Sequence, residues 1–273
     1  NKHHEELLNK YDTNNDKIIS LDEYLSNELS KGSKEKKGKI DYSYLDSSNI
    51  HNYFYILFLK IKKFKIMCIP NSKILIEEGF LEEKAAVAFV IDKKKLIVSK
   101  DIKKSLNSCI KKDKVRFIFF TFLIVKTGLK FSHANIIIID LIKKTVERFE
   151  PYGHTMPVTL ANSNILDSVI KKKLMKKIGI EKYKYLSPIN LSPKSGIQSK
   201  EISICGLCVT IVMMYLHMRI LNPDLSQRKV VEYFTSKTKK KLNNIVLRYL
   251  KNVEETLKSN KNIIINLKKE LNI

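Results

Sequence analysis

Two residues in the stretch HANIIIIDLIKKTVERFEPYG are of types that transfer protons as a pair. His133 begins an apolar run, and Glu150 ends the next run, between Phe149 and Pro151. Both runs are expected to be strands, because β-branched and aromatic residues fill them and a short polar turn joins them. Adjacent antiparallel strands bring the start of one beside the end of the next. The sequence therefore predicts that Glu150 lies beside His133 and orients its imidazole.

Two cysteines further along the chain are candidate nucleophiles. Cys205 lies just before the apolar segment 208–221, and Cys208 is its first residue. This segment is expected to form a central helix that ends at Asn222-Pro223. A thiol at the start of a helix lies in the positive field of the helix dipole, which favours the reactive thiolate. The N–H groups of the first helical turn, together with the side chain of Gln198, can donate hydrogen bonds to an oxyanion.

The set of residues resembles the cysteine proteases of the adenovirus type and of the SUMO-specific (Ulp-type) group, and most closely their relatives in large DNA viruses. The resemblance rests on HANIIIID…VERFEPYG, on GIQSKE and on GLCVTIVMMYLHMRILNPD, and covers roughly residues 110–235. It implies a papain-like α+β protease with a catalytic base, an orienting acid, an oxyanion donor and a cysteine nucleophile. The matching residues are His133, Glu150, Gln198 and Cys208, with Cys205 as the alternative nucleophile.

The choice between the two cysteines depends on the alignment. Aligning on the long helix selects Cys208, whereas aligning on the Cys-Gly-Leu step shortly after Gln198 selects Cys205. The chain also departs from many of these relatives, because Ala134 and Ile211 stand where they carry tryptophan. These replacements keep open a second interpretation, a protease-fold scaffold with weak or no catalysis that binds a partner. The CGLC spacing also fits a redox pair or half of a zinc site, but the sequence context favours neither.

A second motif lies near the N-terminus. The segment DTNNDKIISLDE, residues 12–23, fits the template of a calcium-binding loop between two helices. Lys17 departs from the template, because glycine normally makes the sharp turn at this position. We expect an EF-hand-like helix–loop–helix over residues 1–30, with Ca²⁺ as its ligand and no cofactor for catalysis. The expected ligands are Asp12, Asn14, Asp16, the Ile18 carbonyl, Ser20 and Glu23.

Composition limits the class of protein and of partner. The chain has 273 residues with 44% hydrophobic content, which suits a sizeable folded core, and no apolar run reaches the roughly 18–20 residues that span a bilayer. The formal net charge of +23 favours an anionic partner such as nucleic acid, although a solvated lysine-rich surface is the simpler interpretation. Four cysteines are too few for a disulfide framework, which favours reduced thiols.

The organisation of the chain follows from these patterns. A polar linker at residues 31–41 separates the N-terminal motif from a protease-like domain at residues 42–273. We expect an α+β, papain-like fold with a central, mostly antiparallel sheet packed on helices. Strands are expected near 115–125, 133–140 and 145–150, with a hairpin within 84–99, and helices near 165–180, 208–221, 225–235 and 238–260.

The resemblance also implies a setting for the protein. The expected substrate is a protein or peptide, either a viral precursor polyprotein or a conjugate of a ubiquitin-like modifier. The expected location is the cytoplasm of an infected cell or the virion. Because the chain begins with Asn1 instead of Met, we expect it to be a piece of a longer protein.

Overall fold

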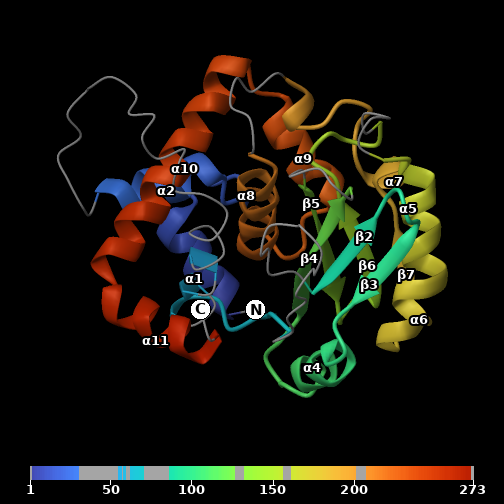
Figure 1. Ribbon diagram of the computed structural model, residues 1–273. Helices are drawn as coiled ribbons and strands as arrows, with labels where there is room; N and C mark the ends of the chain where they lie inside the picture. Colours follow the sequence, from blue (N-terminus) through green and yellow to red (C-terminus); the bar gives the residue numbers. More distant parts are fainter. Residues whose placement is uncertain are drawn as a thin grey trace. The chain divides into compact units, whose positions relative to one another are not determined.

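The computed structural model describes residues 2–30, 55–56, 58–59, 62–70, 86–126, 132–155, 161–200 and 207–271. The chain divides into two compact units (Figure 1). Asn1–Phe64 and Glu201–Ile273 form the first, here called the helical unit, and Lys65–Lys200 form the second, the sheet unit.

The sheet unit is built on one mixed sheet. Within the described residues the sheet has seven strands in the order β3-β2-β4-β5-β6-β7, and β1 also pairs with β4. The strands are β1 (Met67–Cys68), β2 (Val87–Val90), β3 (Lys95–Val98), β4 (Phe117–Val125), β5 (Ser132–Asp140), β6 (Thr145–Phe149) and β7 (Lys184–Leu186).

The pairing corrects one expectation. The β2–β3, β4–β5 and β5–β6 pairs are antiparallel, but β1–β4, β2–β4 and β6–β7 are parallel. The sheet is therefore mixed: the expected antiparallel pairing holds for β4–β5 and β5–β6, which carry the site, but half of the strand pairs are parallel. Parallel neighbours need long crossover connections. In this chain the connections contain helices, and no local sequence pattern shows which strand the chain pairs with after each helix.

One face of the sheet packs on helices that lie within these crossovers (Figure 1). They are α4 (Ile102–Ile110) and a continuous helical segment made of α5 (Ser163–Val169), the π-helical η2 (Ile170–Leu174) and α6 (Met175–Ile178). Alternate residues of β4, such as Phe120 and Phe122, join Leu106 and Leu166 in a single buried cluster. The predicted helix over residues 165–180 is confirmed, and Gly179 ends it in the left-handed conformation with φ 80°.

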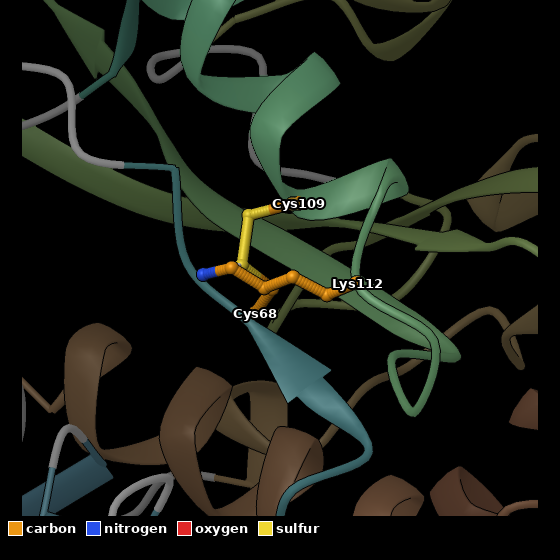
Figure 2. The surroundings of a disulfide bond; sticks show 3 residues. All are labelled: Cys68, Cys109 and Lys112. Atoms are coloured by element: carbon orange, nitrogen blue, oxygen red, sulfur yellow. A yellow bond between two sulfur atoms is a disulfide. The ribbon is translucent and has the colours of Figure 1, made fainter.

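A disulfide bond joins β1 to α4 inside the sheet unit (Figure 2). Cys68 and Cys109 are 41 residues apart in the sequence, and both are buried. The Lys112 ammonium lies 3.8 Å from the Cys68 sulfur. The expectation of reduced thiols is wrong for this pair. The two cysteines meet because β1 pairs with β4 and α4 packs against the same core, a long-range arrangement that cysteine counting does not show.

The helical unit is organised around a buried helix. It contains α1 (Lys2–Tyr11), α2 (Leu21–Ser30), α8 (Cys208–Leu221), α9 (Gln227–Thr235), α10 (Lys239–Ser259) and α11 (Lys261–Leu271). All 14 residues of α8 are buried, which confirms the predicted central helix and its bounds. The helices predicted near 225–235 and 238–260 are also present, and the side chains of Ser226 and Thr238 cap them.

The N-terminal helix–loop–helix packs within this unit. The side chain of Asn222, the residue after α8, accepts a hydrogen bond from the Ile19 N–H (2.8 Å) and donates one to the Ile19 carbonyl (2.9 Å). Arg248 of α10 bonds Asp22 and Ser26 of α2. Residues 2–30 are therefore tied to both α8 and α10. In the described part of the chain, no helix combines the length and apolar character that crossing a membrane requires.

Candidate catalytic site

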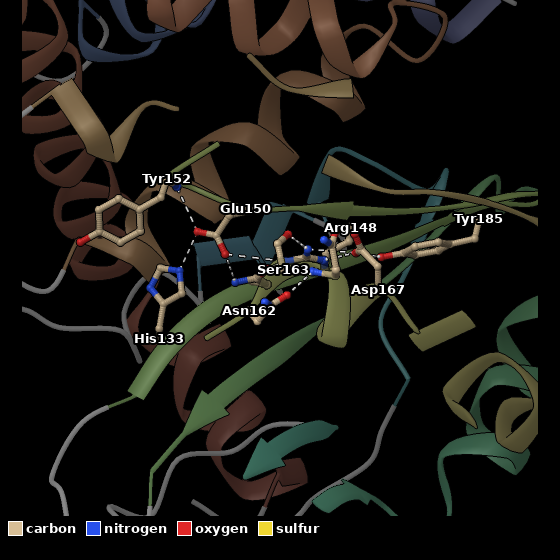
Figure 3. Close-up of polar contacts among 10 residues, drawn as sticks. His133, Arg148, Glu150, Tyr152, Asn162, Ser163, Asp167 and Tyr185 are labelled. Atoms are coloured by element: carbon tan, nitrogen blue, oxygen red, sulfur yellow. Dashed lines mark hydrogen bonds and ion pairs between the residues drawn. The ribbon is translucent and has the colours of Figure 1, made fainter. Parts of the chain in front are cut away.

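The site in the sheet unit centres on two buried side chains (Figure 3). The Nε2 atom of His133 lies 2.7 Å from Oε1 of Glu150, and the two residues are 2% and 0% exposed. His133 is near the start of β5, and Glu150 directly follows β6. The antiparallel pairing of β5 with β6 brings these two ends together, as the sequence predicts.

The carboxylate of Glu150 is held at both oxygens. Oε1 also accepts a hydrogen bond from the Tyr152 N–H (3.0 Å), and Oε2 accepts one from the side-chain amide of Asn135 (2.8 Å). Burial favours the neutral acid, but the charge and hydrogen bond of His133 and the positive charge of Arg148 hold the pKa of Glu150 below its usual value. Glu150 is therefore an ionised acceptor with a fixed orientation.

This arrangement requires a proton on one particular nitrogen of His133. An ionised carboxylate only accepts hydrogen bonds, so the proton lies on Nε2 of His133. The other ring nitrogen, Nδ1, can then act as the basic atom of the neutral imidazole. The ring of Tyr152 lies 5.3 Å from the imidazole, centroid to centroid, and covers it on one side. A histidine whose distal nitrogen is bonded to a buried carboxylate has the geometry of an oriented general base.

Two short loops fix the position of Gln198. Its N–H donates to the Pro151 carbonyl (2.9 Å), and the Gly196 N–H donates to the Tyr152 carbonyl (2.8 Å). The loops approach so closely that a Cβ on Gly196 would lie 2.2 Å from the nitrogen of Gly153, which has φ 90°. Only glycines permit this contact. The backbone of Gln198 is thus bonded to Pro151, the residue after Glu150. The Oε1 atom of Gln198 is buried and has no hydrogen-bond partner among the described residues.

The candidate nucleophile belongs to the helical unit. Cys208 is the first residue of α8, carries a free thiol and is 8% exposed. Its predicted place at the N-terminus of the buried helix is confirmed. Cys205, the alternative nucleophile, lies outside the described residues. The sheet unit therefore assembles His133, Glu150 and the Gln198 segment, while the role of Cys208 stays a prediction.

The sequence analysis did not identify two buried polar residues that contact Glu150. Asn135 of β5 and Arg148 of β6 are both fully buried, at 0% exposure, and both contact Glu150. A signal for them exists in the sequence. Asn135 follows His133 by two residues and Arg148 precedes Glu150 by two, and a period of two puts residues on the same face of a strand.

The predicted calcium loop has the turn that its sequence suggests. Asx-type hydrogen bonds run from the N–H groups of Asp16 and Ile18 to the side chains of Asn14 and Asp16, respectively, and the Lys17 N–H donates to the side chain of Asp12. Lys17 adopts φ 62°, the left-handed conformation that glycine usually supplies at this position. Burial opposes ionisation of Glu23, but hydrogen bonds from Ser20 and Thr13 hold its pKa below the usual value.

One feature of the loop fits a bound cation and another does not. Oδ1 of Asp12 is a buried atom without a hydrogen-bond partner among the described residues, as expected of an oxygen that serves a metal. However, the described residues contain no group of three or more His, Cys, Asp or Glu side chains that could hold a metal ion. Calcium binding by the six predicted ligands stays a prediction.

Comparisons with known proteins give distant similarities. No protein-family model matches the chain. The chain is 26% identical over 184 residues to ankyrin repeat protein L371 of Acanthamoeba polyphaga mimivirus, a match that covers 59% of this chain. It spans only 23% of the length of that relative. Among solved structures, the C-terminal Ulp1 protease domain in complex with Smt3, the yeast orthologue of SUMO, aligns with a TM-score of 0.35 and 13% identity, over 85% of this chain and 92% of that one.

Proposed function

We propose that the chain is a thiol endopeptidase with a Cys-His-Glu triad. The observation that carries the proposal is the buried hydrogen bond of 2.7 Å between His133 and the ionised Glu150. A buried imidazole–carboxylate pair positions a base, and the nearby loops fix Gln198 beside it. The motif order His, acid, Gln and Cys at the start of a helix supports Cys208 as the partner thiol.

The proposed reaction follows from these roles. Nδ1 of His133 takes the proton of the Cys208 thiol, and the thiolate attacks the carbonyl carbon of the scissile peptide bond. The Gln198 side chain and the first N–H groups of α8 donate hydrogen bonds to the oxyanion. The imidazolium, stabilised by Glu150, protonates the leaving amine, which leaves a thioester on the cysteine. His133 then deprotonates a water molecule, which hydrolyses the thioester and restores the thiol. Cys205 is the alternative nucleophile.

The proposed substrate is a protein. Two classes are compatible with the resemblance, a viral precursor polyprotein and a ubiquitin-like conjugate, both with a glycine-containing cleavage site. The similarity to a mimivirus protein supports a viral setting, and with it the virion or the cytoplasm of an infected cell.

A second partner is proposed for the charged surface of the sheet unit. Exposed lysines of α4, η2 and α6 form what is here called the lysine face, and none of them forms an ion pair within the described part of the chain. Lys103 of α4 lies against Gly179 at the end of α6, so the helices contribute to one surface. A polyanion such as nucleic acid is the partner that such a surface fits. The lysine face consists of Lys103, Lys104, Lys171, Lys172, Lys173, Lys176 and Lys177.

A regulatory cation is proposed for the N-terminal loop. Asp12, Asn14, Asp16, the Ile18 carbonyl, Ser20 and Glu23 would bind Ca²⁺ through oxygen atoms, the ligands this ion prefers. The bonds between Asn222 and Ile19 would connect the occupied loop to the end of α8. A catalytically weak scaffold that responds to Ca²⁺ is the alternative to the protease.

Covalent labelling tests the proposed function. The full chain is treated with a glycyl peptide or a ubiquitin-like protein that ends in a thiol-reactive group, and the adduct is located by mass spectrometry. Wild type is compared with Cys208→Ala and Cys205→Ala. Labelling that Cys208→Ala abolishes supports the proposed triad, and labelling that only Cys205→Ala abolishes moves the nucleophile. If neither thiol reacts with the probe, the scaffold interpretation replaces the protease.

A further inference from the structure

A buried arginine lies near Glu150, on the side away from His133 (Figure 3). Arg148 is 0% exposed, and a buried cation is costly unless it is paired and hydrogen-bonded. Its pair is Asp167 of α5, whose Oδ1 lies 3.0 Å from Nε and 2.9 Å from Nη2 of the guanidinium. Nη2 also donates to the Ser163 hydroxyl (2.7 Å), and the Tyr185 hydroxyl donates to Asp167 (2.6 Å). Two residues of α5, Asp167 and Ser163, therefore fix the position of the guanidinium.

Asn135 lies between this cation and Glu150. Its Oδ1 accepts from Nη1 of Arg148 (2.7 Å), and its Nδ2 donates to Oε2 of Glu150 (2.8 Å). The orientation of the amide follows from chemistry, because a guanidinium only donates hydrogen bonds and an ionised carboxylate only accepts them. Nη1 of Arg148 and Oε2 of Glu150 are 3.8 Å apart, close enough to attract and beyond hydrogen-bond distance.

We propose that Asn135 is a positioning residue that keeps Arg148 from binding Glu150 directly and so reserves the carboxylate for His133. The proposal rests on the role of His133 as the base of the proposed protease. Arginine pairs with carboxylates in a two-pronged geometry that is stronger than a hydrogen bond to neutral imidazole. If Arg148 moved the short distance to Glu150 and bound it directly, the carboxylate would turn away from His133. Asn135 prevents this because it bonds both groups, and the ion pair with Asp167 keeps the guanidinium near α5.

The arrangement has a measurable consequence for His133. Two titratable groups that the structure describes lie against its ring: Glu150, bonded to Nε2, and Tyr152, at 5.3 Å between centroids. A carboxylate within hydrogen-bond distance favours the charged imidazolium and therefore raises the pKa of a histidine. If Arg148 captured Glu150, this stabilisation would be lost. The pKa of His133 therefore reports which partner the carboxylate has.

The test is a histidine titration by NMR on the full chain. We compare wild type with Asn135→Leu, which keeps the branching of the side chain and removes its polar atoms, and with Asn135→Ser, whose side chain is too short to bond Arg148 and Glu150 together. Asn107→Leu on the exposed side of α4 is the matched control. The proposal predicts that the pKa of His133 falls by about one unit or more in both test variants and not in the control. Thermal unfolding of each variant identifies any that does not fold.

A double variant separates positioning from general support of the fold. Replacing Arg148 as well, in Asn135→Leu/Arg148→Met, removes the competitor for Glu150. The pKa of His133 is then expected to return towards its wild-type value, although the double variant is the less stable protein. An unchanged pKa of His133 in both Asn135→Leu and Asn135→Ser would overturn the proposal. If Asn135→Leu does not fold, Asn135→Ser decides, because its smaller polar side chain is easier to accommodate in the buried site.

The titration also distinguishes this proposal from the proposed function. The pKa of His133 is measured without a nucleophile or a substrate. A shift in the test variants with no probe labelling of the wild-type chain would support the positioning role and refute the protease. Probe labelling of the wild type with an identical pH profile in Asn135→Leu would keep the protease and refute the positioning role.

Discussion

Acidification is expected to destabilise the helical unit through one histidine. His217 lies in the middle of α8 at 0% exposure, and neither ring nitrogen has a hydrogen-bond partner among the described residues. The rings of Tyr24, Tyr55 and Phe64 lie 4.4, 5.9 and 5.7 Å from it, centroid to centroid. Burial, followed by the positive charge of Lys63, lowers the pKa of His217 to about 3. The folded protein therefore holds this imidazole in its neutral form.

The size of the effect follows from linkage. In the unfolded chain His217 titrates at its ordinary pKa of 6.5, so between pH 6.5 and 3 the unfolded state binds more protons than the folded state. Stability is thus complete above pH 6.5 and falls as the pH falls. Each pH unit within this window is worth up to about 1.4 kcal/mol. The free energy of unfolding is expected to drop by about 2 kcal/mol between pH 7 and pH 5 from this residue alone.

Urea unfolding at several pH values measures this effect. The comparison is between wild type and His217→Leu, which keeps the apolar contacts and removes the titrating group. We expect the variant to be at least as stable as wild type at pH 7, because no protein hydrogen bond to the ring is lost, and to lose about 2 kcal/mol less on going to pH 5. Identical pH dependence in the two proteins would refute the reasoning.

Three further predictions concern the other features of the chain. Gly196→Ala places a Cβ 2.2 Å from the Gly153 nitrogen, so Gln198 must move, and peptide cleavage is expected to slow by roughly a hundredfold; an unchanged rate would contradict the role of Gln198. Ca²⁺ is expected to raise the melting temperature of wild type and not of Glu23→Gln, and no rise in wild type would remove the calcium site. Replacing the lysines at 171–173 by serine is expected to reduce DNA retention and its salt dependence, whereas the same change at 239–241 serves as the control; equal retention in both would exclude the lysine face.

The sequence was informative where a local pattern decides the structure. Asn222-Pro223 ends α8 where the sequence predicts, and strict apolar runs with short turns place β4, β5 and β6. The meeting of His133 and Glu150 was predictable for the same reason, because adjacent antiparallel strands leave their side chains little choice of neighbour.

Features that depend on distant segments were not predictable. The Cys68–Cys109 disulfide requires β1 to pair with β4 after a crossover of nearly fifty residues, and no spacing rule contains that information. The Arg148–Asp167 pair joins a strand to a helix in the next crossover, so neither residue shows its partner in the local sequence. The bonds between Ile19 and Asn222 cross 203 positions. Each depends on tertiary packing and not on local propensity.

The central claim is that Cys208 and His133 act together, and the alkylation rate of Cys208 tests it most directly. The rate is measured at pH 7 with a small chloroacetamide in wild type, in His133→Ala and in urea-unfolded chain, with each thiol followed separately by mass spectrometry. An ordinary thiol is only a few per cent thiolate at this pH, so pairing with His133 is expected to accelerate Cys208 by about tenfold or more over the unfolded chain. The account predicts that His133→Ala removes this acceleration. Equal rates in wild type and His133→Ala would contradict it.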